Sequence, residues 1–293
     1  MHFVLLSVIC SVVVSVLLKL APRYGVDVRQ AITLNYLVAA LLTLGFLQAQ
    51  PRELLTAPAA DLRALWPVCI ALAFLLPSIF VVLAVSVRKL GVARTDAAQR
   101  LSLLLPLLAA FTLFGEAFNW AKGFGVGVGL LAIVCLLWRP GAGQSATSSG
   151  RGAGLWLLAV FVGMGVIDIL FKRVAQLHVL SSGTALLLIF TLAFVIALLG
   201  MIVLWWRGSA RPAWRQLGGG VLLGLFNFGN IWFYIRAHRA LPSDPALVFS
   251  AMNIGVIALS AVIGLWLFRE RLGALNKLGL VLAVVAVVLL ASV

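Results

Sequence analysis

NIGVIALSAVIGLWLFRERLGALNKLG, residues 253–279, is the stretch that decides the fold, because a second copy of it occurs earlier in the chain. Moved back by 154 positions, it aligns with QRLSLLLPLLAAFTLFGEAFNWAKGFG, residues 99–125, and Glu116 then aligns with Glu270. In each copy an apolar run of helical length ends in Phe-x-Glu, and a second apolar run follows. This pattern is typical of two membrane helices joined by a charged bend. The chain therefore contains an internal repeat.

The composition is that of an integral membrane protein. Hydrophobic residues make up 63% of the 293 residues and charged residues only 10%, which a soluble domain of this length does not need. The apolar residues form runs of roughly 18–25, long enough to cross a hydrocarbon layer of about 30 Å as helices. Because the runs are continuous and do not alternate with polar residues, they favour helices. We expect ten transmembrane helices, at residues 2–21, 30–48, 64–87, 96–114, 120–138, 153–173, 182–206, 216–239, 245–268 and 272–292.

Charge and cysteine content exclude several classes of partner. The net charge of +14 comes from 22 Lys and Arg against 8 Asp and Glu. These basic residues stand singly or in pairs at the expected helix ends, where they suit lipid headgroups and form no face for nucleic acid. Cys10, Cys69 and Cys135 lie inside apolar runs without metal-ligand spacing, so we expect small core residues, no metal and no cofactor.

The repeat predicts the organisation of the whole chain. Residues 1–138 form a first five-helix repeat, 139–152 a low-complexity linker, and 153–293 a second five-helix repeat. The first helix lacks the basic start and cleavage site of a signal peptide, so we keep it in the mature protein. An odd number of spans per repeat sends the second copy into the membrane from the opposite side. We therefore expect an all-α integral membrane fold, with two inverted repeats around a central cavity as in secondary transporters.

Polar residues inside the expected spans need a reason to be there, because hydrocarbon does not tolerate them. On the helix at 216–239, three of them lie three and four positions apart and share one face. Two interpretations remain open: hydrogen bonds between helices, or the lining of a solute cavity. The candidates for lining are Lys19, Asn35, Tyr36, Gln99, Asn227, Asn230, Tyr234 and Asn253.

Asp168 and Lys172 are the candidates for coupling. They stand four positions apart in one expected helix, so their side chains can pair. Either the pair is structural, or its carboxylate is coupled to a proton or to the substrate. Lys19 aligns with Lys172 in the repeat but has Ser15 four positions before it. It either faces the cavity or reaches for the membrane surface.

Other features of the sequence have structural interpretations. Glu116 and Glu270 begin the last helix of each repeat, where a carboxylate favours the helix dipole, so we treat them as structural markers. Four alternating glycines in residues 123–129 give two overlapping G-x-x-x-G registers, which predict close packing of helices. Pro77 and Pro106 are expected to kink their helices.

Catalytic motifs are missing from the sequence. His2, His178 and His238 stand at the ends of expected helices and share no spacing with acids or cysteines. The chain contains neither H-E-x-x-H nor G-x-S-x-G. We therefore do not expect an enzyme.

The whole chain resembles EamA-type members of the drug/metabolite transporter superfamily. The resemblance rests on ten expected helices in two halves and on the segments that end matching helices, Leu113–Glu116 and Leu267–Leu272. The resemblance implies a basket of ten helices around a central cavity, alternating access, and export or exchange of a small metabolite such as an amino acid, sugar, nucleotide sugar or drug. We further expect a multi-pass protein of the cell (inner) membrane that is a monomer or weak dimer and binds no nucleic acid, with H⁺ or Na⁺ as the candidate coupling ions. The family has no shared substrate residues to carry over.

Orientation in the membrane stays open. Fifteen Lys and Arg fall on the side of the first loop and seven on the other, a bias that puts both termini outside the cytoplasm. Members of the family usually keep both termini inside and carry basic C-terminal tails, whereas this chain ends in Ala-Ser-Val.

Two alternatives to a transporter remain. One is a membrane-embedded enzyme with a clustered acid, base or metal, and the other is a channel or structural membrane protein.

Overall fold

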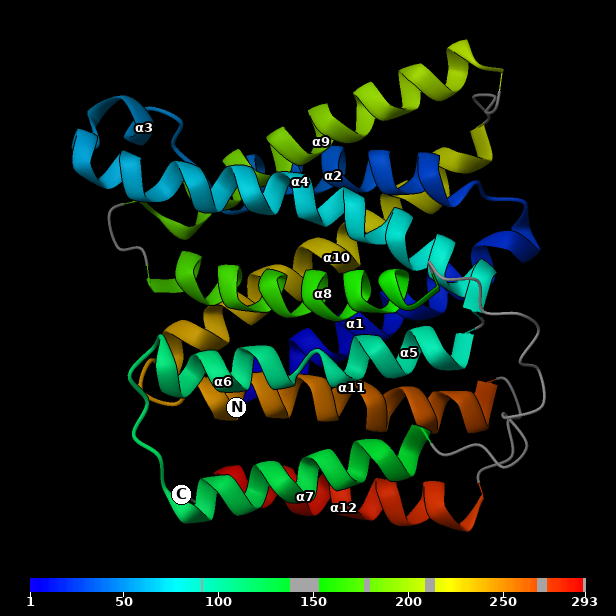
Figure 1. Ribbon diagram of the computed structural model, residues 1–293. Helices are drawn as coiled ribbons and strands as arrows, with labels where there is room; N and C mark the ends of the chain where they lie inside the picture. Colours follow the sequence, from blue (N-terminus) through cyan, green and yellow to red (C-terminus); the bar gives the residue numbers. More distant parts are fainter. Residues whose placement is uncertain (91, 138–152, 177–179, 209–213, 268–272, 292–293) are drawn as a thin grey trace. The chain divides into compact units, whose positions relative to one another are not determined.

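A computed structural model describes residues 1–90, 92–137, 153–176, 180–208, 214–267 and 273–291, and over these residues it contains helices and no strand (Figure 1). A short 3₁₀ turn, Ala21–Tyr24, follows the first helix. The α-helices are α1 (His2–Leu20), α2 (Val28–Phe46), α3 (Glu53–Thr56), α4 (Ala59–Leu90), α5 (Val92–Leu101), α6 (Leu104–Thr112), α7 (Trp120–Leu137), α8 (Ala153–Gln176), α9 (Ser182–Trp206), α10 (Trp214–Ala240), α11 (Pro245–Leu267) and α12 (Ala274–Ala291).

Several of these helices have the length and composition needed to cross a membrane. Five apolar segments qualify: Val28–Phe46, Leu62–Val87, Gly154–Gln176, Ser182–Trp206 and Gln216–Ala240. At 1.5 Å per residue, each reaches across most or all of a hydrocarbon layer about 30 Å thick. Shorter apolar helices occur at His2–Leu18, Ala98–Thr112, Trp120–Cys135, Pro245–Ser260 and Lys277–Ala286. The all-helical architecture expected from the sequence is therefore confirmed.

One expected helix is interrupted. The sequence predicts a single helix at 96–114, but α5 ends at Leu101 and α6 begins at Leu104. Pro106 explains the break, because a proline ring clashes with the carbonyl four residues earlier, here that of Ser102. That carbonyl instead accepts a tighter bond from the Leu105 N–H at 3.0 Å. The kink predicted at this proline is thus a complete interruption, whereas α4 continues through Pro77.

The chain divides into two compact units. Unit 1 comprises Met1–Val8, Ile79–Ile169 and Ala240–Val293, and unit 2 comprises Ile9–Ser78 and Leu170–Arg239. Each unit draws helices from both predicted repeats, so packing in space does not follow the order of the sequence. The repeat boundaries stay a prediction, and the predicted linker at 139–152 lies outside the described residues.

In unit 1, α7 packs against α12 and α11 packs against both. The bounds of α7 and α12 differ by the repeat offset of 154 at both ends. Figure 1 shows the two helices side by side and running in opposite directions. Small residues allow this packing: Ala132 of α7 and its repeat counterpart Ala286 of α12 share one buried cluster with Ile254. The glycine pattern of α7 serves the same interface, since a Cβ on Gly129 would lie 2.6 Å from Ile254.

In unit 2, α2 packs against α9. These two helices also begin 154 residues apart, and they too run in opposite directions in Figure 1. On a third helix, α10, Gly220 and Gly224 face α2 at close range. A Cβ on Gly224 would lie 2.6 Å from the Cβ of Val38, so α10 approaches α2 only because a side chain is missing there.

Candidate functional site

The interior of unit 2 contains polar atoms that no other described residue satisfies. Asn35 and Tyr36 of α2 are both 0% exposed. The amide nitrogen and oxygen of Asn35 and the hydroxyl of Tyr36 have no hydrogen-bond partner among the described residues. A buried polar group without a partner costs about 1–3 kcal/mol. These two side chains are therefore the first candidates for contact with a solute.

A second polar stripe runs along α10. Asn227 and Tyr234 are buried and Asn230 is half-buried, as the spacing of three and four residues predicts. The Tyr234 ring meets Phe171 of α8 edge-on, with 6.3 Å between ring centroids. His238 continues the stripe one turn later, and its ring centroid lies 4.8 Å from that of Tyr234.

The structure buries the side chains of both Lys172 and His238 in unit 2, Lys172 completely. The burial of His238 is a feature that the sequence analysis missed. The missed signal is the position of His238 four residues after Tyr234, on the face already identified. The sequence analysis considered His238 only as a residue at a helix end without spacing to acids or cysteines.

The remaining coupling and lining candidates lie on α1, α5, α8 and α11. Asp168 is half-buried on α8, one turn before Lys172, so their pairing stays a prediction. Gln99 and Asn253 are half-buried. The backbone carbonyl of Gln99 accepts from the Ser102 hydroxyl at 2.6 Å, and the side-chain amide of Asn253 donates to the Phe249 carbonyl at 3.0 Å. Their role in lining a cavity stays a prediction. The side chain of Lys19, like Glu270 as a whole, lies outside what the structure describes.

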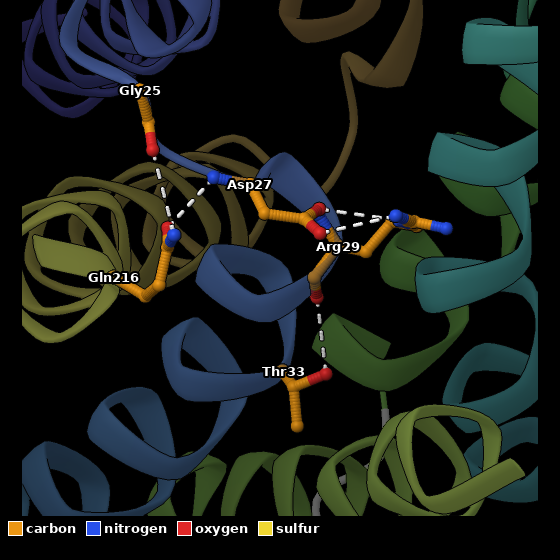
Figure 2. A network of polar contacts seen from close by, with 5 residues as sticks. All are labelled: Gly25, Asp27, Arg29, Thr33 and Gln216. Atoms are coloured by element: carbon orange, nitrogen blue, oxygen red, sulfur yellow. Dashed lines mark hydrogen bonds and ion pairs between the residues drawn. The ribbon is translucent and has the colours of Figure 1, made fainter. Parts of the chain in front are cut away.

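The start of α2 is tied to the start of α10 by the polar network in Figure 2. Asp27 caps α2 by accepting the Arg29 N–H at 2.9 Å, and it pairs with the Arg29 guanidinium at 3.1 Å. Its own N–H donates to the Gln216 amide oxygen at 2.7 Å, and the amide nitrogen of Gln216 donates to the Gly25 carbonyl at 3.5 Å. Partial burial alone would raise the pKa of Asp27, but the hydrogen bonds and charge of Arg29 outweigh it and lower that pKa.

The start of α9 is held in a comparable way, by residues that precede α4. Ser181 caps α9 by accepting the Thr184 N–H at 3.2 Å, and the Ser181 N–H donates to Glu53 at 2.9 Å. The Thr184 hydroxyl accepts the Gln50 N–H at 3.2 Å. Slight burial raises the pKa of Glu53, but the bonds from Ser181 and Thr184 lower it overall. The caps Asp27 and Ser181 are again 154 residues apart, and each is bound by the other predicted repeat.

Unit 1 contains a cluster of charges around Glu116, whose side chain is 1% exposed. One carboxylate oxygen accepts from Lys122 at 3.0 Å, and the other accepts the Ala246 N–H at 2.8 Å. Lys122 also binds Asp244, at 2.5 Å. Glu116 therefore binds the first turn of α11 in the second repeat, whereas the sequence interpretation had assigned it to the start of α7. We call Glu116, Lys122 and Asp244 the charge cluster.

Cysteines and potential metal ligands form no centre in the described part of the chain. Cys10, Cys69 and Cys135 form no disulfide with one another. No group of three or more His, Cys, Asp or Glu side chains is placed there to hold a metal ion. The expectations of no metal and no cofactor stay predictions.

Comparison with known proteins gives one family and one fold. No sequence model of a known family matches the chain. An uncharacterized protein of Haemophilus influenzae is 39% identical over 287 residues, which cover 98% of this chain and 96% of that protein. A protein of known crystal structure shares the fold, with a TM-score of 0.71 and 17% identity over 98% of this chain and 95% of its own. Neither comparison bears on the resemblance to EamA-type transporters.

Proposed function

The chain belongs to the family of the uncharacterized Haemophilus influenzae protein, and we propose that it is a secondary transporter that moves a small metabolite by alternating access. In this proposal the ten apolar helices cross the cell (inner) membrane as two inverted five-helix repeats, as in EamA-type members of the drug/metabolite transporter superfamily. Export or exchange, coupled to H⁺ or Na⁺, is the expected mode. Such a carrier works because two halves of equal construction rock about a site between them.

One observation carries the proposal: helices at matching places in the two repeats pack against each other and run in opposite directions. This holds for α7 with α12 and for α2 with α9, and both pairs begin 154 residues apart. Opposite directions are what an axis in the membrane plane produces, because it turns one copy upside down. Two copies inserted the same way up would give parallel counterparts.

The polar interior of unit 2 supports a solute path over the alternative functions. A membrane enzyme needs an acid, base or nucleophile at the reacting atoms, and a channel needs a continuous pore with lining charges. Apart from His238, the buried polar groups on α2 and α10 are the neutral amides, hydroxyls and phenols of Asn, Gln, Thr and Tyr. Neutral donors and acceptors of this kind suit reversible binding of a small polar solute.

Uptake into proteoliposomes tests the proposal. Purified protein is reconstituted and offered a panel of radiolabelled amino acids, sugars and nucleobases under imposed pH or Na⁺ gradients. We expect saturable, gradient-stimulated uptake of at least one solute above protein-free vesicles. Asp168→Asn should lose the stimulation by a pH gradient while keeping exchange of solute across the membrane. No uptake of any solute in either gradient would contradict the proposal.

A further inference from the structure

The two unsatisfied side chains on α2 have counterparts in the second repeat that carry no polar atoms. Shifted by 154 positions, Asn35 becomes Ile189 and Tyr36 becomes Phe190. All four side chains are 0% exposed. The same buried places are thus filled by polar groups on α2 and by hydrocarbon on α9.

The match between these places extends along both helices. Ala31 and Ala185 are both 3% exposed, and Ala39 and Ala193 are both 0% exposed, again 154 residues apart. The two helices therefore bury equivalent faces. Because α9 packs with Ile and Phe at the places in question, this packing does not require an amide or a hydroxyl.

The unsatisfied polar atoms of Asn35 and Tyr36 therefore lower the stability of the fold and make no hydrogen bond with the described residues in exchange. A buried amide whose donor and acceptor are both unsatisfied destabilises the folded state, and apolar groups of similar shape remove that destabilisation. Phe190 differs from Tyr36 by only one hydroxyl, so size does not explain the tyrosine. The atoms that the described residues leave unsatisfied are the ones available to a bound solute.

We propose that Asn35 and Tyr36 recognise the transported solute through a planar group that carries a hydrogen-bond donor beside an acceptor. A primary amide has this edge, and so does adenine, whose amino group lies beside a ring nitrogen. The amide of an asparagine pairs with such an edge through two hydrogen bonds. The hydroxyl of Tyr36, the next residue on α2, is the second unsatisfied group available to the solute. This inference rests on the proposed transport function and specifies its substrate class.

The closed surroundings of the pair agree with alternating access. Solvent does not reach either side chain, and α10 lies close to the helix at this point, since a Cβ on Gly224 would be 2.9 Å from the Asn35 carbonyl. A solute therefore reaches the pair only when the helices around α2 move. A site of this kind is closed in one state and open in another.

Thermal unfolding in lipid nanodiscs without added solute tests the structural half of the inference. Asn35→Leu and Tyr36→Phe should melt at the wild-type temperature or above it, because each removes an unsatisfied polar group. Ile189→Asn is the matched control and should melt several degrees lower, because it adds such a group at the equivalent place. If Asn35→Leu lowers the melting temperature as much as Ile189→Asn does, the amide is structural and the inference is wrong.

Four probes test the substrate class in the same nanodiscs. L-glutamine is compared with L-methionine, which lacks the carboxamide, and adenine with purine, which lacks the amino group. At least one of L-glutamine and adenine should raise the wild-type melting temperature more than its comparison probe does. That difference should vanish in Asn35→Leu and shrink in Tyr36→Phe. No difference in the wild type for either pair, or a difference that both variants keep, would overturn the inference.

Uptake into proteoliposomes separates this inference from the proposed function. If the wild type binds one of these probes through Asn35 but moves no solute of the panel, the transport proposal fails and the binding site stands. If a solute is taken up equally fast by wild type, Asn35→Leu and Tyr36→Phe, transport stands and the inference fails.

Discussion

At the scale of single residues, the charge cluster of unit 1 illustrates how a buried carboxylate is held. Glu116 uses both oxygens, one for the Lys122 ammonium and one for the Ala246 N–H. A charge so fully enclosed is stable only with partners on every side, because desolvation costs several kcal/mol per ion. The pairing joins the loop before α7 to the start of α11, and so joins the two predicted repeats.

Glu116→Gln should therefore destabilise the protein. The amide nitrogen would face either Lys122 or the Ala246 N–H, both of which are donors, so we expect a loss of about 1–3 kcal/mol. Glu53→Gln is the matched control, since Glu53 also accepts a backbone N–H at a helix start but is more exposed. It should lose less than about 1 kcal/mol. The measurement is the melting temperature of each variant in nanodiscs. Equal losses of stability in Glu116→Gln and Glu53→Gln would contradict the stabilising role of the charge cluster.

Single residues also show which contacts could be predicted from the sequence and which could not. The spacing on α10 identified a buried face, and Asn227 and Tyr234 lie on it. His238 continues this spacing, four residues after Tyr234. Because it stands near a helix end, the sequence analysis did not predict that it is buried. The hydrogen bond between Glu116 and the Ala246 N–H could not be predicted, because a sequence does not show which helix start a loop carboxylate will bind. These contacts are set by tertiary packing.

At the scale of helices, glycines determine which surfaces approach each other. The sequence interpretation recognised the pattern on α7, where Gly129 lies against α11 and α12. It did not identify Gly220 and Gly224 of α10 as a packing pair, although they have the same four-residue spacing. The positions of the helices followed directly from the apolar runs. The break between α5 and α6 was expected only as a kink, because sequence alone does not give the degree to which a proline disrupts a helix.

Gly224→Ala should weaken the packing of α10 on α2. Its new Cβ would lie 2.6 Å from the Cβ of Val38 and 2.9 Å from the Asn35 carbonyl, and neither atom can move without moving α2. We expect a loss of about 1–3 kcal/mol, as for other overpacked cores. Gly218→Ala on the same helix is the control, because nothing lies within 4 Å of its added Cβ. A melting temperature of Gly224→Ala equal to that of the control would show that the helices are not this close.

At the scale of the whole molecule, the account depends on the orientation of two copies in the membrane. The helical class and several apolar helices of spanning length agree with the sequence. The repeat offset recurs in the helix starts, in the caps Asp27 and Ser181, and in the buried residues of α2 and α9.

The most direct measurement labels the first residues of α7 and α12 from each side of the membrane. Trp120 and Ala274 are exposed and 154 residues apart, and each is replaced singly by cysteine after Cys10, Cys69 and Cys135 have been changed to alanine. A membrane-impermeant maleimide is then applied to intact cells and to inverted membrane vesicles. Inverted repeats predict that one cysteine reacts only in cells and the other only in vesicles. Reaction of both cysteines from the same side would contradict the account.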